Sequence, residues 1–133
     1  MIIISVDLGK ARTGLAISDK TGFLASPLCM IEEKSEAKRL EKVASAVKEN
    51  KAELVVVGLP KNMDGSEGDS AKSAREFAQK LTELTGIKTV MQDERGTTIT
   101  AHNYLSQRDV RGKKRKQTVD IVAASIILQD YLD

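Results

Sequence analysis

The sequence predicts an α/β protein with one mixed sheet of five strands and helices on both faces of the sheet. Three apolar segments rich in β-branched residues, at 2–7, 13–18 and 23–31, come before the first helical pattern. After them, helical and strand patterns alternate, which is typical of right-handed strand-helix-strand crossovers. Residues 54–58, Leu-Val-Val-Val-Gly, form a continuous apolar run of the kind that is buried on both faces of a parallel sheet.

The first three strands are expected to form an antiparallel meander. Short connections separate them, a turn at 8–12 and a Thr-Gly pair at 21–22. Pro27 lies within the third strand and has no N–H to give to a ladder, so this strand should lie at an edge of the sheet or contain a bulge there.

Four helices and one further strand complete the predicted order. In the helix at 35–50, apolar residues recur with helical spacing and Ser35 is placed to cap the first turn. Gly86 is a suitable stop for the second helix. The remaining segments are the helix at 69–85, the strand at 89–93, a helix at about 97–107, a basic loop at 108–116 and a last helix at about 117–132.

Length and composition indicate a single soluble domain over residues 1–133. Hydrophobic residues make up 41% of the chain and charged residues 30%, both ordinary for a globular protein. An apolar run of about 18 residues is missing, so we expect no membrane span, and the N-terminus resembles a strand more than a signal peptide. The single cysteine, Cys29, lies in an apolar stretch and predicts a buried structural thiol. These features favour a cytoplasmic protein that has no membrane partner.

Basic residues are concentrated in one short segment. Six of the nine residues from Arg108 to Lys116 are Lys or Arg, and one is an acid. Charge alone is equally compatible with a solvated loop and with a strip that contacts phosphates. Aromatic residues make up only 3% of the chain, which disfavours a platform for stacking single-stranded bases. Any binding of nucleic acid should therefore depend on backbone charge and shape.

Acidic residues follow two of the predicted strands. Asp7 ends the first strand, and Asp93 and Glu94 end the last one. Ligands of open α/β sheets gather at the carboxyl ends of parallel strands, so these acids meet at one edge if their strands are parallel. Two acidic groups are thus brought together by the strand pattern itself.

Asp120 is the candidate for a third acid at this edge. It shares one helical face with Ala123, Ala124 and Ile127, and an aspartate that is buried on such a face needs a partner or a cation. The alternative is a surface acid near a helix N-terminus, where the helix dipole favours it. The helix pattern leaves both interpretations open.

Three carboxylates from distant parts of the chain suit one or two hard divalent cations such as Mg²⁺ or Mn²⁺. Two such ions can activate a water and stabilise the leaving oxygen in the cleavage of a phosphodiester bond. One histidine, His102, and one cysteine do not supply the usual ligands of a zinc site.

Two glycines after the first strand, Gly9 and Gly14, have two compatible interpretations. A glycine loop can cradle phosphate with its backbone N–H groups. A tight hairpin can equally require glycine because its backbone adopts a positive φ.

Four segments, in order and at matching separations, resemble the motifs of the YqgF (RuvX-like) family of nucleases. The resemblance covers essentially the whole chain, and one departure is Gly96, where relatives usually carry Leu. The segments are 7–16 (DLGKARTGLA), 58–65 (GLPKNMDG), 93–95 (DER) with Thr97 and Thr98, and 113–116 (KKRK) with Val119, Asp120, Ala123, Ala124 and 127–129 (ILQ).

This resemblance implies an RNase H-like fold and metal-dependent cleavage of nucleic acid. It assigns Asp7, Glu94 and Asp120 as the catalytic acids and metal ligands. Asp93 is the alternative to Glu94, and since a strand alternates its side chains, the two cannot both face the metal.

We further expect a set of side chains that hold the substrate. Arg95, Arg12 and the basic segment would contact phosphates, and a loop after the fourth strand would position the substrate. The residues concerned are Arg12, Asn62, Asp64, Arg95, Lys113, Lys114, Arg115 and Lys116.

The substrate itself is implied only by the resemblance. Members of the family are described as nucleases that trim the 5′ end of precursor 16S ribosomal RNA and as Holliday-junction resolvases, and we favour the RNA. A resolvase should be a symmetric dimer, but the sequence leaves monomer and homodimer open. Two less favoured alternatives are a non-catalytic nucleic-acid-binding module and an ATPase-like nucleotide-binding domain, which would need a second lobe.

Overall fold

The computed structural model describes residues 1–9, 11–62, 64–93 and 112–133, with the side chains of the last helix described from Val122 onward. Glu94, Arg95 and the predicted helix at 97–107, which includes His102, lie outside the described residues.

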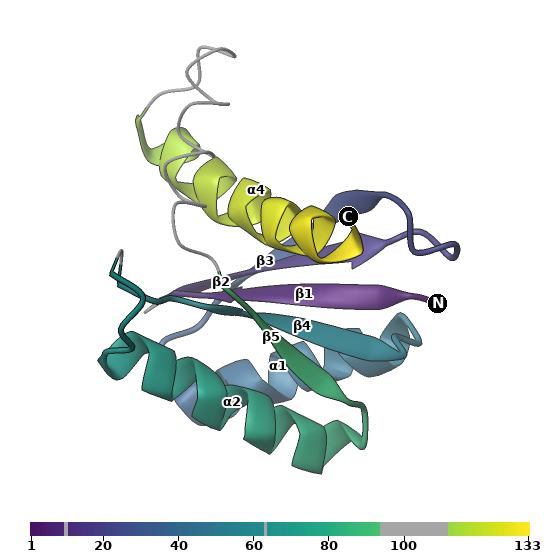
Figure 1. The fold of residues 1–133 in the computed structure, drawn as a ribbon, viewed down its shortest axis with the longest axis horizontal. Coiled ribbons are helices and arrows are strands. Elements are labelled where there is room, and N and C mark those ends of the chain that lie inside the picture. The colour runs from purple at the N-terminus through teal and green to yellow at the C-terminus, as the bar shows by residue number, and fades with distance from the viewer. Residues whose placement is uncertain (10, 63, 94–111) are drawn as a thin grey trace.

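A five-stranded mixed sheet forms the centre of the structure (Figure 1). Its strands occur in the order β3-β2-β1-β4-β5. β1 pairs antiparallel with β2, and β2 with β3, whereas β4 pairs in parallel with both β1 and β5. The strands are β1 Ile3–Leu8, β2 Arg12–Ser18, β3 Ala25–Glu32, β4 Leu54–Leu59 and β5 Thr89–Asp93. The predicted meander and the predicted mixed sheet are both confirmed.

Parallel pairing brings the carboxyl ends of β1, β4 and β5 to one edge of the sheet, which we call the carboxyl edge. The helices α1, Glu36–Glu49, and α2, Asp69–Thr85, both begin at this edge. α1 connects β3 to β4, and α2 connects β4 to β5. Ser35 caps α1 by accepting a hydrogen bond from the backbone N–H of Lys38 at 3.4 Å. Gly86 ends α2 in the left-handed conformation, with φ at 74°. Both predicted helix signals are confirmed.

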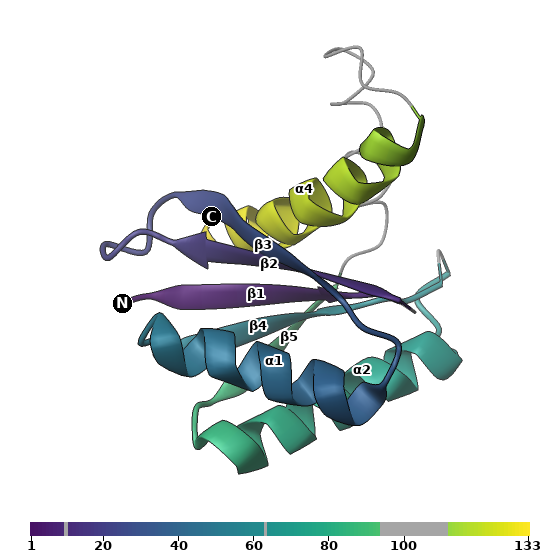
Figure 2. The ribbon, with the colours of Figure 1, turned by 180° about the vertical axis from the view of Figure 1, so that it is seen from behind.

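Helices cover both faces of the sheet (Figures 1 and 2). α1 and α2 pack on one face, against a core that includes Ile4, Val6 and Leu15. On the opposite face lies α4, Gly112–Leu132, which buries Ala124 and Ile127 against a second cluster. We call these the α1–α2 face and the α4 face. None of the helices in the described part of the chain is long and apolar enough to cross a bilayer.

Hydrogen bonds from the sheet fix α4 at two points. The buried hydroxyl of Ser5 donates a hydrogen bond to the carbonyl oxygen of Ala124 at 2.7 Å. Near the start of the sheet, the backbone N–H of Ala25 donates to Oε1 of Gln129 at 3.0 Å. α4 therefore runs antiparallel to β1, with its N-terminal half toward the carboxyl edge.

The start of α4 corrects the sequence prediction. The predicted basic loop ended at Lys116, but the helix begins at Gly112, so Lys113, Lys114, Arg115 and Lys116 belong to its first turns. Lys and Arg are good helix formers, and a high density of charge does not itself interrupt a helix.

The outer strand β3 confirms one prediction and overturns another. Its pairing with β2 shifts between Leu15 and Ala16, opposite Cys29 and Pro27, so the proline lies on an edge strand and beside a bulge. Cys29 is exposed, so the prediction of a buried thiol is wrong. Partial desolvation raises the pKa of Cys29, which makes it a poor candidate for an activated thiolate.

Candidate active site

Asp7 is half-buried near the carboxyl end of β1. Its neighbours Val6 and Leu8 pack against the core on the α1–α2 face, while Ser5, two residues earlier, contacts α4. Since side chains alternate along a strand, Asp7 belongs to the α4 face. The carboxylate of Asp7 therefore lies near the carboxyl end of β1, on the face of the sheet that α4 covers.

Glycines flank Asp7 on both neighbouring strands. Gly14 of β2 is its direct partner in the antiparallel ladder. On the other side, Val6 pairs with Val57, so the same register places Gly58 beside Asp7. Neither of these two neighbours in the sheet has a side chain of its own beside the carboxylate.

The register of β5 separates Asp93 from Asp7. Val90 packs on the α4 face and Met91 on the α1–α2 face. Asp93 pairs with Leu59, a buried residue of the core beneath α1 and α2. Asp93 thus belongs to the α1–α2 face, whereas Asp7 belongs to the α4 face. If the strand alternation continues for one residue, position 94 falls on the α4 face.

Asp120 lies in α4 one helical turn before Ala124. Ser5 of β1 contacts Ala124 of α4, and β1 and α4 run antiparallel. Going back one helical turn from Ala124 to Asp120 therefore leads in the same direction as going forward along β1 from Ser5 to Asp7. The backbone course is compatible with the predicted approach of Asp120 to Asp7, but the side chain of Asp120 is outside the described residues.

Arg12 opens β2 on the same face as Asp7. It is separated by two residues from Gly14, the partner of Asp7, so the two positions are diagonal neighbours across the ladder. Its Nε lies 3.8 Å from Oε1 of Glu32, and its side chain is only 22% exposed. The Nη1 atom of Arg12 is buried and has no hydrogen-bond partner among the described residues.

A tight turn joins Asp7 to Arg12. The backbone N–H of Gly9 donates to the carbonyl oxygen of Arg12 at 2.8 Å. A Cβ atom at position 9 would lie 2.5 Å from that same oxygen, closer than real Cβ contacts allow. Gly9 does lie in a tight turn, but the predicted positive φ is wrong, since Gly9 is not among the glycines with positive φ. Glycine is required there because the Arg12 carbonyl approaches too closely for a side chain.

Replacing Gly9 with Ala is expected to destabilise the protein, because the new methyl group must displace the Arg12 carbonyl and strain the turn. We expect a loss of about 1–3 kcal/mol in the free energy of unfolding, the usual cost of overpacking. Urea denaturation followed by circular dichroism measures this. A variant as stable as the wild type would show that the turn relaxes without cost.

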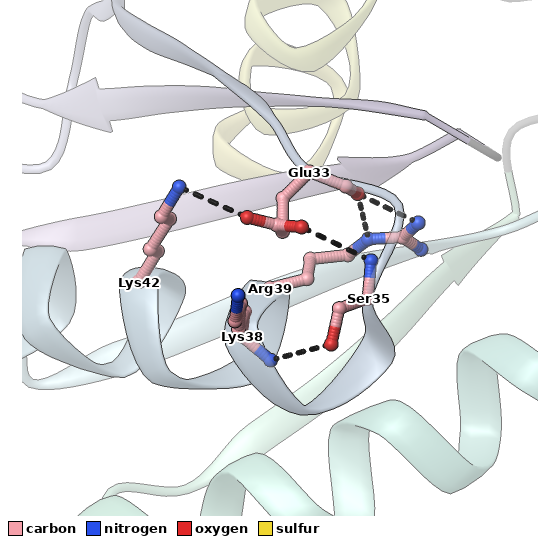
Figure 3. A network of polar contacts seen from close by, with 5 residues as sticks. All are labelled: Glu33, Ser35, Lys38, Arg39 and Lys42. Atoms are coloured by element: carbon pink, nitrogen blue, oxygen red, sulfur yellow. Dashed lines mark hydrogen bonds and ion pairs between the residues drawn. The ribbon is translucent and has the colours of Figure 1, made fainter.

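A polar network fixes the other side of this turn (Figure 3). The backbone N–H of Glu33 donates to the carbonyl oxygen of Ala11 at 2.9 Å. Arg39 donates from Nε and Nη2 to the carbonyl oxygen of Glu33, at 3.3 and 3.1 Å. The carboxylate of Glu33 accepts from the backbone N–H of Ser35 and from Lys42, contacts that hold its pKa below the usual value. The network ties the start of α1 to the turn that precedes Arg12.

Asn62 and Asp64, predicted to position substrate, have a structural role in the loop after β4. Oδ1 of Asp64 accepts hydrogen bonds from the backbone N–H and the hydroxyl of Ser66, at 2.9 and 2.6 Å. Asn62 donates from Nδ2 to the same hydroxyl at 2.9 Å. Their polar groups therefore stabilise the conformation of this part of the loop, which lies at the carboxyl edge.

The end of that loop is fixed to α2. Glu67 accepts two hydrogen bonds from Arg75, at 2.7 and 2.9 Å, and this contact lowers the pKa of Glu67. The pair resembles the bidentate geometry in which arginine and carboxylate bind each other best. Glu67 thus ties the end of the β4–α2 loop to α2.

A groove of about 650 Å³ lies between α1 and α2. Leu8 and Gly9 form part of its wall, together with Leu40 and Phe77. Because Leu8 points to the α1–α2 face, this groove lies behind the sheet with respect to Asp7. The groove and the carboxylate are consequently separate features.

Sequence reasoning missed two features of this site, the contact of Glu32 with Arg12 and the network around Glu33. Both depend on how β2 and β3 are aligned, since Arg12 pairs directly with Glu32. The register follows from the bulge beside Pro27, which the sequence places only approximately. Aligning β2 and β3 by the alternation of their apolar residues would have been the available way to predict this register from the sequence.

The chain is similar to several known proteins. A family model described as "RuvX: Holliday junction resolvase" matches residues 1–133. A protein of Clostridium botulinum (strain Alaska E43 / Type E3), whose name proposes a pre-16S rRNA nuclease, is 42% identical over 133 residues, which cover 100% of this chain and 97% of the relative. A protein of Leuconostoc citreum (strain KM20) with the same name is 42% identical over 136 residues, covering 100% and 95%.

Among solved structures, Thermus thermophilus RuvC in complex with a Holliday junction substrate is similar with a TM-score of 0.64 and 11% sequence identity, over 99% of this chain and 93% of that chain. At this identity the likeness concerns the fold, and it confirms the predicted RNase H-like architecture. With the full-length relatives, it defines the protein as a nuclease of the RNase H-like class. More specifically, the chain belongs to the RuvX family.

Proposed function

We propose that the protein is a metal-dependent nuclease whose catalytic carboxylates are Asp7, Glu94 and Asp120. The observation that supports this most directly is the position of Asp7, half-buried on the α4 face between Gly14 and Gly58 at the carboxyl edge. Ligands of open α/β sheets gather at this edge. A non-catalytic binder of polyanions would gain nothing from a carboxylate at this position.

The cation would be Mg²⁺ or Mn²⁺. Carboxylate oxygens are the ligands that these hard ions prefer. The neighbour of Asp7 on β2 is a glycine, which adds no side chain beside the carboxylate. Asp7, Glu94 and Asp120 would hold it. When bound, such an ion supplies Lewis-acid stabilisation of phosphate charge and a water of lowered pKa.

Cationic side chains would hold the phosphates of the substrate. Arg12 lies on the face of Asp7, and the first turns of α4 carry a dense basic segment. Lysine and arginine contacts to the backbone make binding salt-dependent and largely independent of sequence. The proposed contacts are Arg12, Arg95, Lys113, Lys114, Arg115 and Lys116, with Asn62 and Asp64 shaping the loop beside them.

Precursor 16S ribosomal RNA is the substrate that we favour, processed near its 5′ end in the cytoplasm. The full-length relatives with 42% identity support this choice through their names. The second candidate is a four-way DNA junction. It is favoured by the description of the family model and by the likeness in fold to a resolvase solved with a Holliday junction.

A side-by-side cleavage assay separates the two substrates. Precursor ribosomal RNA and a synthetic four-way junction are each incubated with Mg²⁺, with Mn²⁺ and with EDTA. We expect metal-dependent cleavage of the RNA and little cleavage of the junction. Paired symmetric cuts in the junction by a dimer, with intact RNA, would instead establish the resolvase, and the oligomeric state is measured by light scattering alongside. If neither substrate is cut with either metal, the proposal of a nuclease active on these substrates is wrong.

A further inference from the structure

We propose that Arg12 binds a non-bridging oxygen of the scissile phosphate and stabilises the charge that develops on it during cleavage. This inference rests on the proposed nuclease function. It gives Arg12 a role at the reacting group, distinct from the general backbone contacts of the basic segment in α4.

The first support is the state of the guanidinium. Arginine stays charged in proteins and offers five N–H donors. In Arg12 the Nη1 atom is buried yet has no hydrogen-bond partner among the described residues. Leaving a buried donor unsatisfied costs about 1–3 kcal/mol, and more for a charged group. Such a cost is expected where a group is held ready for a ligand.

The second support is the partner that Arg12 does have. Oε1 of Glu32 is 3.8 Å from its Nε, beyond hydrogen-bond distance, and the side chain of Glu32 is 61% exposed. An ion pair of this length at the surface contributes little. It orients the guanidinium without using up its donors, so an anion can still be bound.

The third support is position. Arg12 is the diagonal neighbour of Asp7 on the α4 face, at a spacing that long side chains can bridge. Gly14, the direct partner of Asp7, stands between Arg12 and Ala16 on that face of β2 and places no side chain between Arg12 and Asp7. A phosphate held next to Asp7 would therefore lie within reach of the guanidinium.

The fourth support is the rigidity of the backbone around Arg12. Its carbonyl oxygen accepts from Gly9 at 2.8 Å, and the carbonyl of Ala11 accepts from Glu33 at 2.9 Å. Arg39 in turn holds the carbonyl of Glu33 from α1 (Figure 3). Catalytic donors are most effective when they are fixed before the reaction, since no free energy is then spent on ordering them.

Single-turnover kinetics of the full-length protein test the proposal, with the substrate that the wild type cleaves. In R12Q we expect the rate of the cleavage step to fall about 100-fold or more, the loss typical of one charge-stabilising donor. Affinity for the same nucleic acid, measured with Ca²⁺ in place of Mg²⁺, should change less than about threefold, because the contact matters mainly in the transition state. The control K20Q removes a positive charge at the far end of the sheet and should leave both quantities unchanged.

A phosphorothioate at the scissile phosphate gives a readout that a structural role would not move. We expect the wild type to be slowed by sulfur at the oxygen that Arg12 contacts, and R12Q to lose this additional slowing. R12K keeps the charge but not the planar geometry, so its rate should be intermediate. It also serves if R12Q does not fold.

Two results would overturn the proposal. One is a rate within threefold of the wild type in R12Q. The other is a slow R12Q or R12K whose phosphorothioate effect equals that of the wild type, which would show that the arginine acts only on the fold. A wild type that cleaves no nucleic acid would instead contradict the proposed function itself.

Discussion

Replacing Asp7 with Asn is expected to lower the rate of metal-dependent cleavage on the order of a thousandfold, equivalent to about 4 kcal/mol of activation free energy. The substitution keeps the size and shape of the side chain but removes the negative charge and one oxygen ligand. Because Asp7 is only half-buried and lies between glycines, the fold should tolerate the amide. The measurement is initial rate against protein concentration in purified D7N.

Asp19 offers a matched control for D7N. It lies at the other end of the sheet, where Oδ1 accepts hydrogen bonds from the backbone N–H of Phe23 and the hydroxyl of Thr21, both at 2.9 Å. D19N should therefore lower the melting temperature and leave the cleavage rate of the folded protein unchanged. Full activity in D7N preparations free of contaminating nuclease would remove Asp7 from the mechanism.

The lowered pKa of Asp19 gives the D19N control a second use. Hydrogen bonds, chiefly from Phe23, lower the pKa of Asp19 in the folded protein. The stability that this carboxylate contributes is thus present above its ordinary pKa near 4 and is lost as pH falls through the lower folded value. The difference in melting temperature between D19N and the wild type should therefore become smaller as the pH falls below about 4.

The general fold could be predicted from sequence because each strand and helix carried its own local signal. The apolar run at 54–58 indicated a buried parallel strand, Ser35 marked a helix start, and Pro27 marked an edge. These signals are local, so they do not depend on which segments become neighbours in space.

Predictions failed where the outcome depended on neighbours. Cys29 lies in an apolar stretch, yet it is exposed because β3 is the outer strand of the sheet. The basic segment was taken for a loop on charge, but Lys113 to Lys116 belong to α4, which the described half of the helix anchors to the sheet through Ser5 and Ala124. For Cys29 the position of the strand in the sheet decided the outcome, whereas for the basic segment the good helix propensity of Lys and Arg was underrated.

The candidate site shows the same division. Strand ends alone indicated that Asp7 and the acids after β5 share an edge, and the parallel pairing of β1, β4 and β5 confirms that arrangement of the strands. The flanking glycines and the unsatisfied nitrogen of Arg12 required the register, which no single segment specifies. The sequence therefore indicated the edge of the sheet at which the site lies, and the structure showed that Asp7 and Arg12 belong to the α4 face.

That register leads to a second large effect, at the end of β5. Replacing Glu94 with Gln should reduce cleavage about as strongly as D7N, on the order of a thousandfold. Replacing Asp93 with Asn should reduce it less than about tenfold. Asp93 pairs with Leu59 on the α1–α2 face, so its carboxylate starts from the face opposite Asp7. The prediction for Glu94 assumes that the alternation of side chains along β5 continues for one more residue.

The two variants control for each other, since each removes one negative charge at adjacent positions of the same strand end. Initial rates are compared at a fixed Mg²⁺ concentration and again across a Mg²⁺ titration. Loss of a metal ligand should raise the Mg²⁺ concentration needed for half-maximal rate, and only E94Q is expected to show this. If D93N shows it and E94Q does not, the strand must rotate after Gln92, and the ligand set becomes Asp7, Asp93 and Asp120. Equal and small effects of both would mean that the second carboxylate comes from elsewhere in the chain.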